Sequence, residues 1–424
     1  MCKVLLALSA MFSLATIAAA AGQSRAADLK VLYDFCAEAD CADGANPAAG
    51  LVADADGNLF GTTVNGGAYS EGTVFEIRKI GKGRYARADT ILASFDGNDG
   101  KYPFAGLIID AEGNLFGTTA GGGATNDGTV FEVLKTAGGY AGTPTVLVSF
   151  DNAGDGAYPQ AGLAADADGN LFGTTFNGGA YGGGTVFEIA KTDAGYADTP
   201  IVLYSFCAQT LCTDGANPAA GLVADADSNL FGTTFSGGGP FGGGTVFEIV
   251  KSAGGYAAAP TTLVDFDYTD GMGSTAGLIA DADGNLFGTT TGYGTTGPPN
   301  GTAFEIAETG NGYAAAPTVL TELRFAEPSA GLIMDKAGNL YGTTYSGGKK
   351  NVFDGVGTVF KITKTAGGYA SLPTTLISFT RKRGKNPEST LIANNKGGLL
   401  GTTYAGGAHG LGTIFEVVGS GFVK

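Results

Sequence analysis

The chain has 424 residues, of which 74 are glycine, 44% are apolar and 15% are charged. This glycine content, well above the usual ~7%, indicates many turns, and the apolar content excludes a disordered chain. Lys and Arg total 24 against 40 Asp and Glu, a net charge of −16, so we expect no nucleic acid partner. With one His in the chain, most zinc and Ser-His-Asp sites lack the residues they need.

Residues 1–26 predict a secretory signal peptide. Lys3 precedes an apolar run from Val4, and small residues follow where a peptidase cuts, after Ala21 or Ala26. No later segment reaches the roughly 18 apolar residues of a membrane span. We therefore expect a secreted mature protein, periplasmic or extracellular, without membrane insertion.

The four cysteines that remain after cleavage form two short loops. Each loop encloses four residues and is followed by the same sequence, DGANPAAGLVADAD. Because export favours oxidation, the spacing predicts two local disulfides, Cys36 with Cys41 and Cys207 with Cys212. A metal site is the alternative, but no His or third Cys lies nearby in the sequence.

Seven copies of one motif dominate the mature sequence. The segment GLVADADGNLFGTT at 50–63 recurs at intervals of 54 to 59 residues, and a motif related to GTVFEI follows each copy. The copies begin at Gly50, Gly106, Gly162, Gly221, Gly277, Gly331 and Thr390. A repeat of this length indicates an architecture of stacked or radially arranged units.

Each repeat contains four apolar runs of strand length, separated by turn residues. In the third repeat they are 162–166, 170–175, 184–189 and 201–206. No window shows the 3.6-residue period of a helix, so the mature chain is predicted to be all-β. Four antiparallel strands at this period are typical of a β-propeller blade, and an open β-solenoid is the alternative.

The two ends of the chain predict how the ring closes. The seventh repeat stops after IFEVV at 414–418 and lacks a fourth strand, while LKVLYDF at 29–35 has the fourth-strand pattern and precedes the first repeat. We expect 29–35 to pair with 412–417, which leaves no unpaired edge. Residues 27–424 would then form a single seven-bladed β-propeller.

The two repeated motifs, of the forms G-N-L-F-G-T-T and G-T-V-F-E-I, resemble the extracellular bacterial tandem repeats known as GloVer repeats, in all seven units. The first half of the unit is also similar to the D-x-x-G-N hairpin of NHL-type propellers. The resemblance implies an exported or surface-displayed protein and brings no established catalytic residues. The seventh unit departs most, with NNKGGLLGTT in place of DADGNLFGTT.

The repeated aspartates, such as Asp54 and Asp56, raise the question of calcium. A D-x-D-x-D-G loop would need an acid at Val52 and ligands near Phe60 or Thr63, so we interpret these residues as turn formers and keep calcium as the alternative. We expect no other cofactor and no metal site. The Gly-Thr-Thr triplet and the tyrosine between the third and fourth strands also recur, which indicates packing roles.

Function is expected where the units differ. If the first strand of each unit lines the channel, the fourth-to-first and second-to-third connectors share one face. On this face the connector TRKRGKNPE at 380–388 breaks the acidic pattern, together with a loop of the sixth unit. The predicted ligand-binding cations are Lys349, Lys350, Arg381, Lys382, Arg383 and Lys385. A solvated run of charges is the alternative interpretation.

These cations suit an anionic ligand, because arginine binds carboxylates and sulfates bidentately. We therefore expect a monomeric binding or surface-interaction module, with an acidic polysaccharide, another envelope component or a surface protein as its partner. The alternative is a carbohydrate-active enzyme, a polysaccharide lyase before a glycoside hydrolase. In a lyase, His409 or Tyr404 would be the candidate catalytic base.

Overall fold

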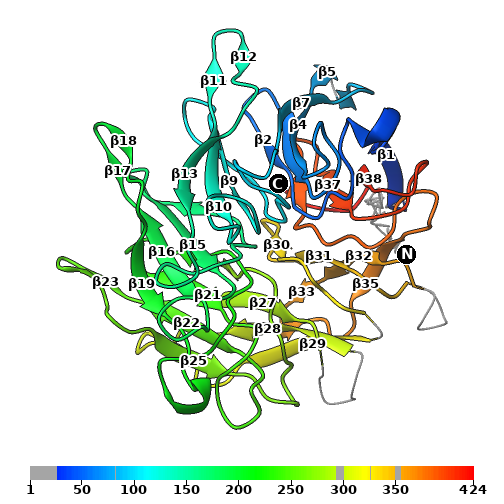
Figure 1. The fold of residues 1–424 in the computed structure, drawn as a ribbon. Coiled ribbons are helices and arrows are strands. Elements are labelled where there is room, and N and C mark those ends of the chain that lie inside the picture. Colours follow the sequence, from blue (N-terminus) through cyan, green and yellow to red (C-terminus); the bar gives the residue numbers. More distant parts are fainter. Residues whose placement is uncertain (1–25, 82, 293–299, 325, 349–354) are drawn as a thin grey trace, which may run out of the picture.

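The protein is a seven-bladed β-propeller, and its computed structural model describes residues 26–81, 83–292, 300–324, 326–348 and 355–424. Seven four-stranded antiparallel sheets surround a central axis (Figure 1). The sequence prediction of an all-β propeller is therefore confirmed. The described residues contain no helix long and apolar enough to cross a membrane.

The strands of each blade run from the channel outward in sequence order, except in the last blade. Blades one and two comprise β2 (Val52–Ala53), β3 (Leu59–Thr63), β4 (Thr73–Ile77) and β7 (Thr90–Ser94), then β8 (Ile108–Ile109), β9 (Leu115–Thr119), β10 (Thr129–Val133) and β13 (Thr145–Ser149). Blades three and four comprise β14 (Ala164–Ala165), β15 (Leu171–Thr175), β16 (Thr185–Ile189) and β19 (Ile201–Ser205), then β20 (Val223–Ala224), β21 (Leu230–Thr233), β22 (Thr245–Ile249) and β25 (Thr261–Asp265). Blades five and six comprise β26 (Ile279–Ala280), β27 (Leu286–Thr290), β28 (Asn300–Ile306) and β29 (Thr318–Arg324), then β30 (Ile333–Met334), β31 (Leu340–Thr344), β32 (Thr358–Ile362) and β35 (Thr374–Ser378).

The N-terminal strand completes the seventh blade, as the sequence predicted. This blade contains β36 (Ile392–Ala393), β37 (Leu399–Thr403), β38 (Thr413–Val418) and, outermost, β1 (Asp28–Asp34). β1 pairs antiparallel with β38, from Asp28 opposite Val418 to Asp34 opposite Thr413. The next residue, Phe35, is fully buried and packs edge-on against Phe75 of blade one, with ring centroids 5.1 Å apart. The closing strand therefore belongs to blade seven and also contacts blade one.

The innermost strands are shorter than the sequence predicted. The run 162–166 contributes only the two residues of β14. Here the backbones approach closely, and a Cβ on Gly50 would lie 2.8 Å from the carbonyl oxygen of Thr390. Thr390 occupies the position that is glycine in the other six repeats. Its Oγ1 accepts a hydrogen bond from Gly331 N at 3.1 Å.

The Gly-Thr-Thr triplet of the second strand has a packing role, as expected. A Cβ on Gly61 would lie 2.7 Å from Phe75 Cζ, so glycine makes room for this buried ring. The Thr62 hydroxyl donates to the carbonyl oxygen of Ala105 in the next blade at 3.0 Å, and the Thr63 hydroxyl lies 2.8 Å from that of Thr73. The triplet therefore joins strands within a blade and blades to each other.

The connectors between the third and fourth strands form small hairpins in five blades. They are β5 (Lys79–Gly81) with β6 (Arg84–Tyr85), β11 (Lys135–Thr136) with β12 (Gly139–Tyr140), β17 (Lys191–Thr192) with β18 (Gly195–Tyr196), β23 (Lys251–Ser252) with β24 (Gly255–Tyr256) and β33 (Lys364–Thr365) with β34 (Gly368–Tyr369). The tyrosines anchor them, as predicted: the ring of Tyr140 packs edge-on against Phe60 of the preceding blade, with centroids 5.7 Å apart.

Both predicted disulfides are present, Cys36 with Cys41 and Cys207 with Cys212. Short 3-10 turns, η1 (Ala39–Cys41) and η2 (Thr210–Cys212), lie inside the two loops. The aspartate motif closes a turn, since the Asp54 carboxylate accepts hydrogen bonds from N and Nδ2 of Asn58, both at 2.8 Å. This contact supports our interpretation of the repeated aspartates as turn formers.

Candidate functional site

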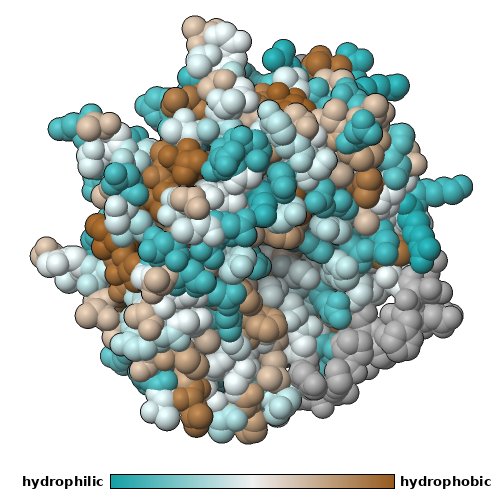
Figure 2. All heavy atoms as spheres, viewed as in Figure 1, coloured by the Kyte–Doolittle hydropathy of each residue, from teal (hydrophilic) through white to brown (hydrophobic). Residues whose placement is uncertain are grey.

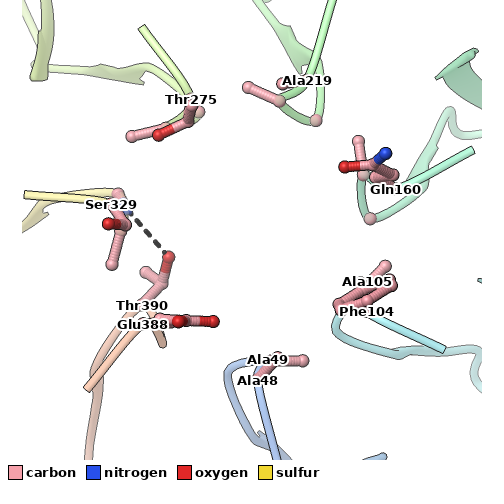
Figure 3. Close-up of a pocket in the computed structure, with 18 of the residues that line it drawn as sticks. Ala48, Ala49, Phe104, Ala105, Gln160, Ala219, Thr275, Ser329, Glu388 and Thr390 are labelled. Atoms are coloured by element: carbon pink, nitrogen blue, oxygen red, sulfur yellow. Dashed lines mark hydrogen bonds between the residues drawn. The ribbon is translucent and has the colours of Figure 1, made fainter. Parts of the chain in front are cut away.

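A cavity of about 620 Å³ lies at one mouth of the central channel. Fourth-to-first connectors from all seven blades line it, together with residues that begin second-to-third connectors, such as Phe176 and Phe235. Figure 3 shows the labelled side chains arranged around an open centre. The predicted sharing of one face by the two kinds of connector is therefore confirmed. We call this space the central cavity.

Each blade presents one variable side chain to the central cavity, two residues before the first position of its repeat. These seven residues are Ala48, Phe104, Gln160, Ala219, Thr275, Ser329 and Glu388. The backbone around them repeats, while the side chains range from small to aromatic to acidic. Sequence reasoning missed this set because no single repeat shows that the position faces a common space.

Aromatic rings line one side of the central cavity. Phe104 comes from the connector before β8, while Phe176 and Phe235 follow the second strands of blades three and four. Phe104 is 39% exposed and Phe235 is 40% exposed, whereas the phenylalanines within the strands are buried. We call these three residues the aromatic arc, because they offer rings to a ligand without belonging to the core.

The other side of the central cavity is acidic. Glu327 and Glu388 line it from the connectors of blades six and seven. In Figure 3, Glu388 points toward the open centre, with Phe104 across from it. Burial raises the pKa of the Glu388 carboxyl to about 7. Burial also raises the pKa of the Tyr345 phenol, with the charges of Glu388 and Glu327 adding to the effect, so these groups lie close together.

Backbone contacts hold the acidic side in place. Tyr345 N donates to the carbonyl oxygen of Glu327 at 2.7 Å, and Asn386 Nδ2 donates to the carbonyl oxygen of Tyr345 at 3.0 Å. Tyr404 N donates to the carbonyl oxygen of Asn386 at 2.9 Å. The connectors of blades six and seven are thus joined at Asn386, two residues before Glu388.

The connector of blade seven, which carries the predicted basic residues, lies beside the central cavity and packs against the loop that carries His409. Gly407 N donates to the carbonyl oxygen of Arg381 at 2.9 Å, and Lys385 N donates to that of Ala405 at 2.6 Å. We call Arg381, Lys382, Arg383 and Lys385 the basic connector. Arg381, Lys382 and Arg383 are exposed and Lys385 is half-buried.

His409 and Tyr404 are described, and one residue of the basic connector has an acidic neighbour. Arg383 Nη2 lies 3.6 Å from Asp28 Oδ1 on β1. His409 is exposed and does not line the central cavity, while Tyr404 is half-buried near Glu388, whose charge adds to the effect of burial in raising its pKa. Lys349 and Lys350 lie outside the described residues.

The sequence model of the Gloeobacter/Verrucomicrobia repeat matches residues 20–165, 137–322 and 299–423. None of the curated proteins matches the chain.

Solved structures of similar shape include a protein named as a 6-phosphogluconolactonase from Bacteroides uniformis, with 14% identity, a TM-score of 0.48, and coverage of 81% of this chain and 88% of that one. A protein named as a glucose dehydrogenase from Thermus thermophilus shares 13% identity, with a TM-score of 0.45 and coverage of 74% and 96%. A gluconolactonase from Xanthomonas campestris shares 13% identity, with a TM-score of 0.40 and coverage of 72% and 82%. At these scores the similarities say nothing about the activity of this chain.

Proposed function

The chain belongs to the Gloeobacter/Verrucomicrobia repeat family, and we propose that it is an exported binding module that holds a glycan at the mouth of its central channel. The observation that carries the proposal is the central cavity, in which exposed rings stand opposite polar and acidic side chains. Concave sites that combine apolar surface with a few polar groups are typical ligand sites. The signal-like residues 1–26 and the two disulfides support export.

The aromatic arc supports a sugar as the ligand. Its rings offer flat apolar surface of a size that covers one face of a pyranose, while Gln160 and Glu327 supply amide and carboxyl groups for hydroxyls. A large apolar docking surface is not seen on the face shown in Figure 2, where hydrophobic residues form small separate patches. The site therefore suits a glycan better than a hydrophobic partner.

A glycan panel tests the proposal directly. The wild-type protein should retain at least one glycan, and the double variant Phe104→Ala, Phe235→Ala should weaken that binding by about 10-fold or more. The matched control is Tyr69→Ala, Tyr181→Ala, which removes two rings that are 62% and 59% exposed outside the central cavity. Absence of any retained glycan, or equal losses in both double variants, would contradict the proposal.

The basic connector favours an acidic polysaccharide as a second candidate ligand. Three of its cations are exposed, and backbone hydrogen bonds to blade seven hold the segment in place. Retention of a sulfated or uronate-containing glycan at low salt should fall with added salt, and Arg381→Ala with Arg383→Ala should abolish it. Arg84→Ala with Arg87→Ala removes the same charge from exposed positions on blade one and is the control. Retention that survives the first double variant would refute this candidate.

Product analysis of any bound glycan separates a binding module from an enzyme. An intact glycan after incubation agrees with the proposal, whereas unsaturated products would establish the lyase alternative. The variant His409→Ala would then be informative, because loss of a catalytic base reduces the rate by roughly 100-fold or more.

A further inference from the structure

The central cavity contains acidic groups without a matching cation. Glu327 and Glu388 line it, and no Lys, Arg or His of the described residues does. Within the described part of the chain, neither carboxyl forms a hydrogen bond or ion pair with another residue. Buried or partly buried carboxyls normally have partners, because removing them from water is costly. Neither carboxyl is among the fully buried unpaired groups of the described residues, so both remain accessible to a ligand that enters the cavity.

The position of Glu388 results from a local departure from the repeat. The sequence NPAAG at 217–221 in unit four becomes NPEST at 386–390 in unit seven, and two of the three changed residues, Glu388 and Thr390, line the cavity. Ser389 Oγ accepts a hydrogen bond from Thr402 N at 2.8 Å, and Thr390 Oγ1 accepts one from Gly331 N at 3.1 Å. The two hydroxyl residues replace small ones and hold the loop, while the third replacement adds an unpaired acid.

Two phenols lie close to Glu388, and no Lys, Arg or His of the described residues lines the central cavity beside it. The charge of Glu388 adds to the effect of burial in raising the pKa of both Tyr345 and Tyr404, and Glu327 acts on Tyr345 in the same way. Burial raises the pKa of Glu388 to about 7, so this carboxyl is largely protonated below neutral pH. A bound cation would favour the ionised form of Glu388 and offset the free-energy cost of burying its charge.

We propose that Glu388 binds the protonated amino group of an amino sugar in the central cavity, on the side that Glu327 also lines, while the rest of the glycan contacts the aromatic arc. This inference rests on the proposed function and names its ligand class. An organic cation suits the site better than a metal ion, because no group of three or more His, Cys, Asp or Glu that could hold a metal occurs in the described residues. Aromatic rings also attract ammonium groups through their π faces.

Two oligosaccharides of glucosamine, equal in length, test the inference. One is fully deacetylated and cationic, and the other is fully N-acetylated and neutral. At pH 6 we expect the cationic oligomer to bind about 10-fold or more tightly than the neutral one, because hydrogen bonds from a charged donor are stronger than those from a neutral one. Glu388→Gln should remove this preference and leave the weaker binding of the neutral oligomer unchanged.

Proton release gives a second readout. Because an ammonium group lowers the pKa of Glu388 from about 7, binding at pH 6 should release up to about one proton per site, measured by calorimetry in two buffers of different ionisation enthalpy. Glu388→Gln should abolish the release. Glu112→Gln, an exposed acid outside the central cavity, should leave both affinity and proton release unchanged. Thermal melting checks that each variant is folded.

The outcomes distinguish this inference from the proposed function. Equal binding of the two oligomers, or an unchanged preference in Glu388→Gln, overturns the inference and leaves a glycan site in place. Binding of other glycans but of neither oligomer also overturns it. Failure to bind any glycan overturns both proposals.

Discussion

Replacement of Asp89 by asparagine is expected to stabilise the propeller above neutral pH. Asp89 lies between β6 and β7, and its Oδ1 is 3.0 Å from the hydroxyl of Tyr33 on the closing strand β1. The same hydroxyl lies 2.7 Å from Asp43 Oδ2, which also accepts a hydrogen bond from Ala37 N at 2.9 Å. Tyr33 has one hydroxyl proton for two carboxylates, so it cannot fully satisfy both, and Asp43 is the closer acceptor.

The pKa of Asp89 sets the size and direction of the effect. Burial raises it from 3.8 to about 7, and the charge of Asp43 adds to the rise while the hydrogen bond from Tyr33 opposes it. A group whose pKa is raised by folding destabilises the folded state as pH rises from 3.8 toward 7. At ~1.36 kcal/mol per pH unit the full cost is about 4 kcal/mol. Partial exposure to solvent reduces the expected cost to about 2–3 kcal/mol.

Asparagine removes the ionisable group and keeps a donor for Tyr33 Oη. Denaturant unfolding should show that Asp89→Asn gains about 2–3 kcal/mol over wild type at pH 8.5 and little at pH 4. Asp198→Asn, an exposed acid in the matching connector of blade three, should change stability by less than about 0.5 kcal/mol at both pH values. An equal gain at the two pH values, or a loss at pH 8.5, would refute the reasoning.

Two further perturbations test the architecture. Deletion of residues 28–35 should lower the melting temperature and promote aggregation, because it exposes the edge of β38; an unchanged melting temperature would contradict closure by β1. Gly61→Ala should cost about 1–3 kcal/mol in denaturant unfolding, since its Cβ would lie 2.7 Å from Phe75 Cζ and 3.1 Å from Leu51 Cδ2. Gly138→Ala is the control, with no atom nearer than 4.0 Å to its Cβ, and a similar loss there would argue against the packing explanation.

The architecture was readable from the sequence because its determinants are local and repeated. Strand-length apolar runs between turn residues recur seven times, and the missing fourth strand of the last unit has its counterpart at 29–35. The disulfides join cysteines five positions apart, a separation that needs no knowledge of the fold. The length of the inner strands was not readable in this way, since the close approach of Gly50 to Thr390 joins residues from opposite ends of the chain.

The central cavity was decided by the tertiary structure alone. Phe104 and Glu388 belong to different repeats, and each occupies the position of the first alanine in the NPAAG motif. Within a single repeat, neither replacement indicates a binding site. The sequence directed attention to the basic connector, where like charges are adjacent along the chain. Burial, which raises the pKa of Glu388, exists only once seven connectors converge on the channel. The sequence of this protein thus determined the blade and the order of the blades, whereas ring closure determined which side chains share a cavity and how much water reaches them.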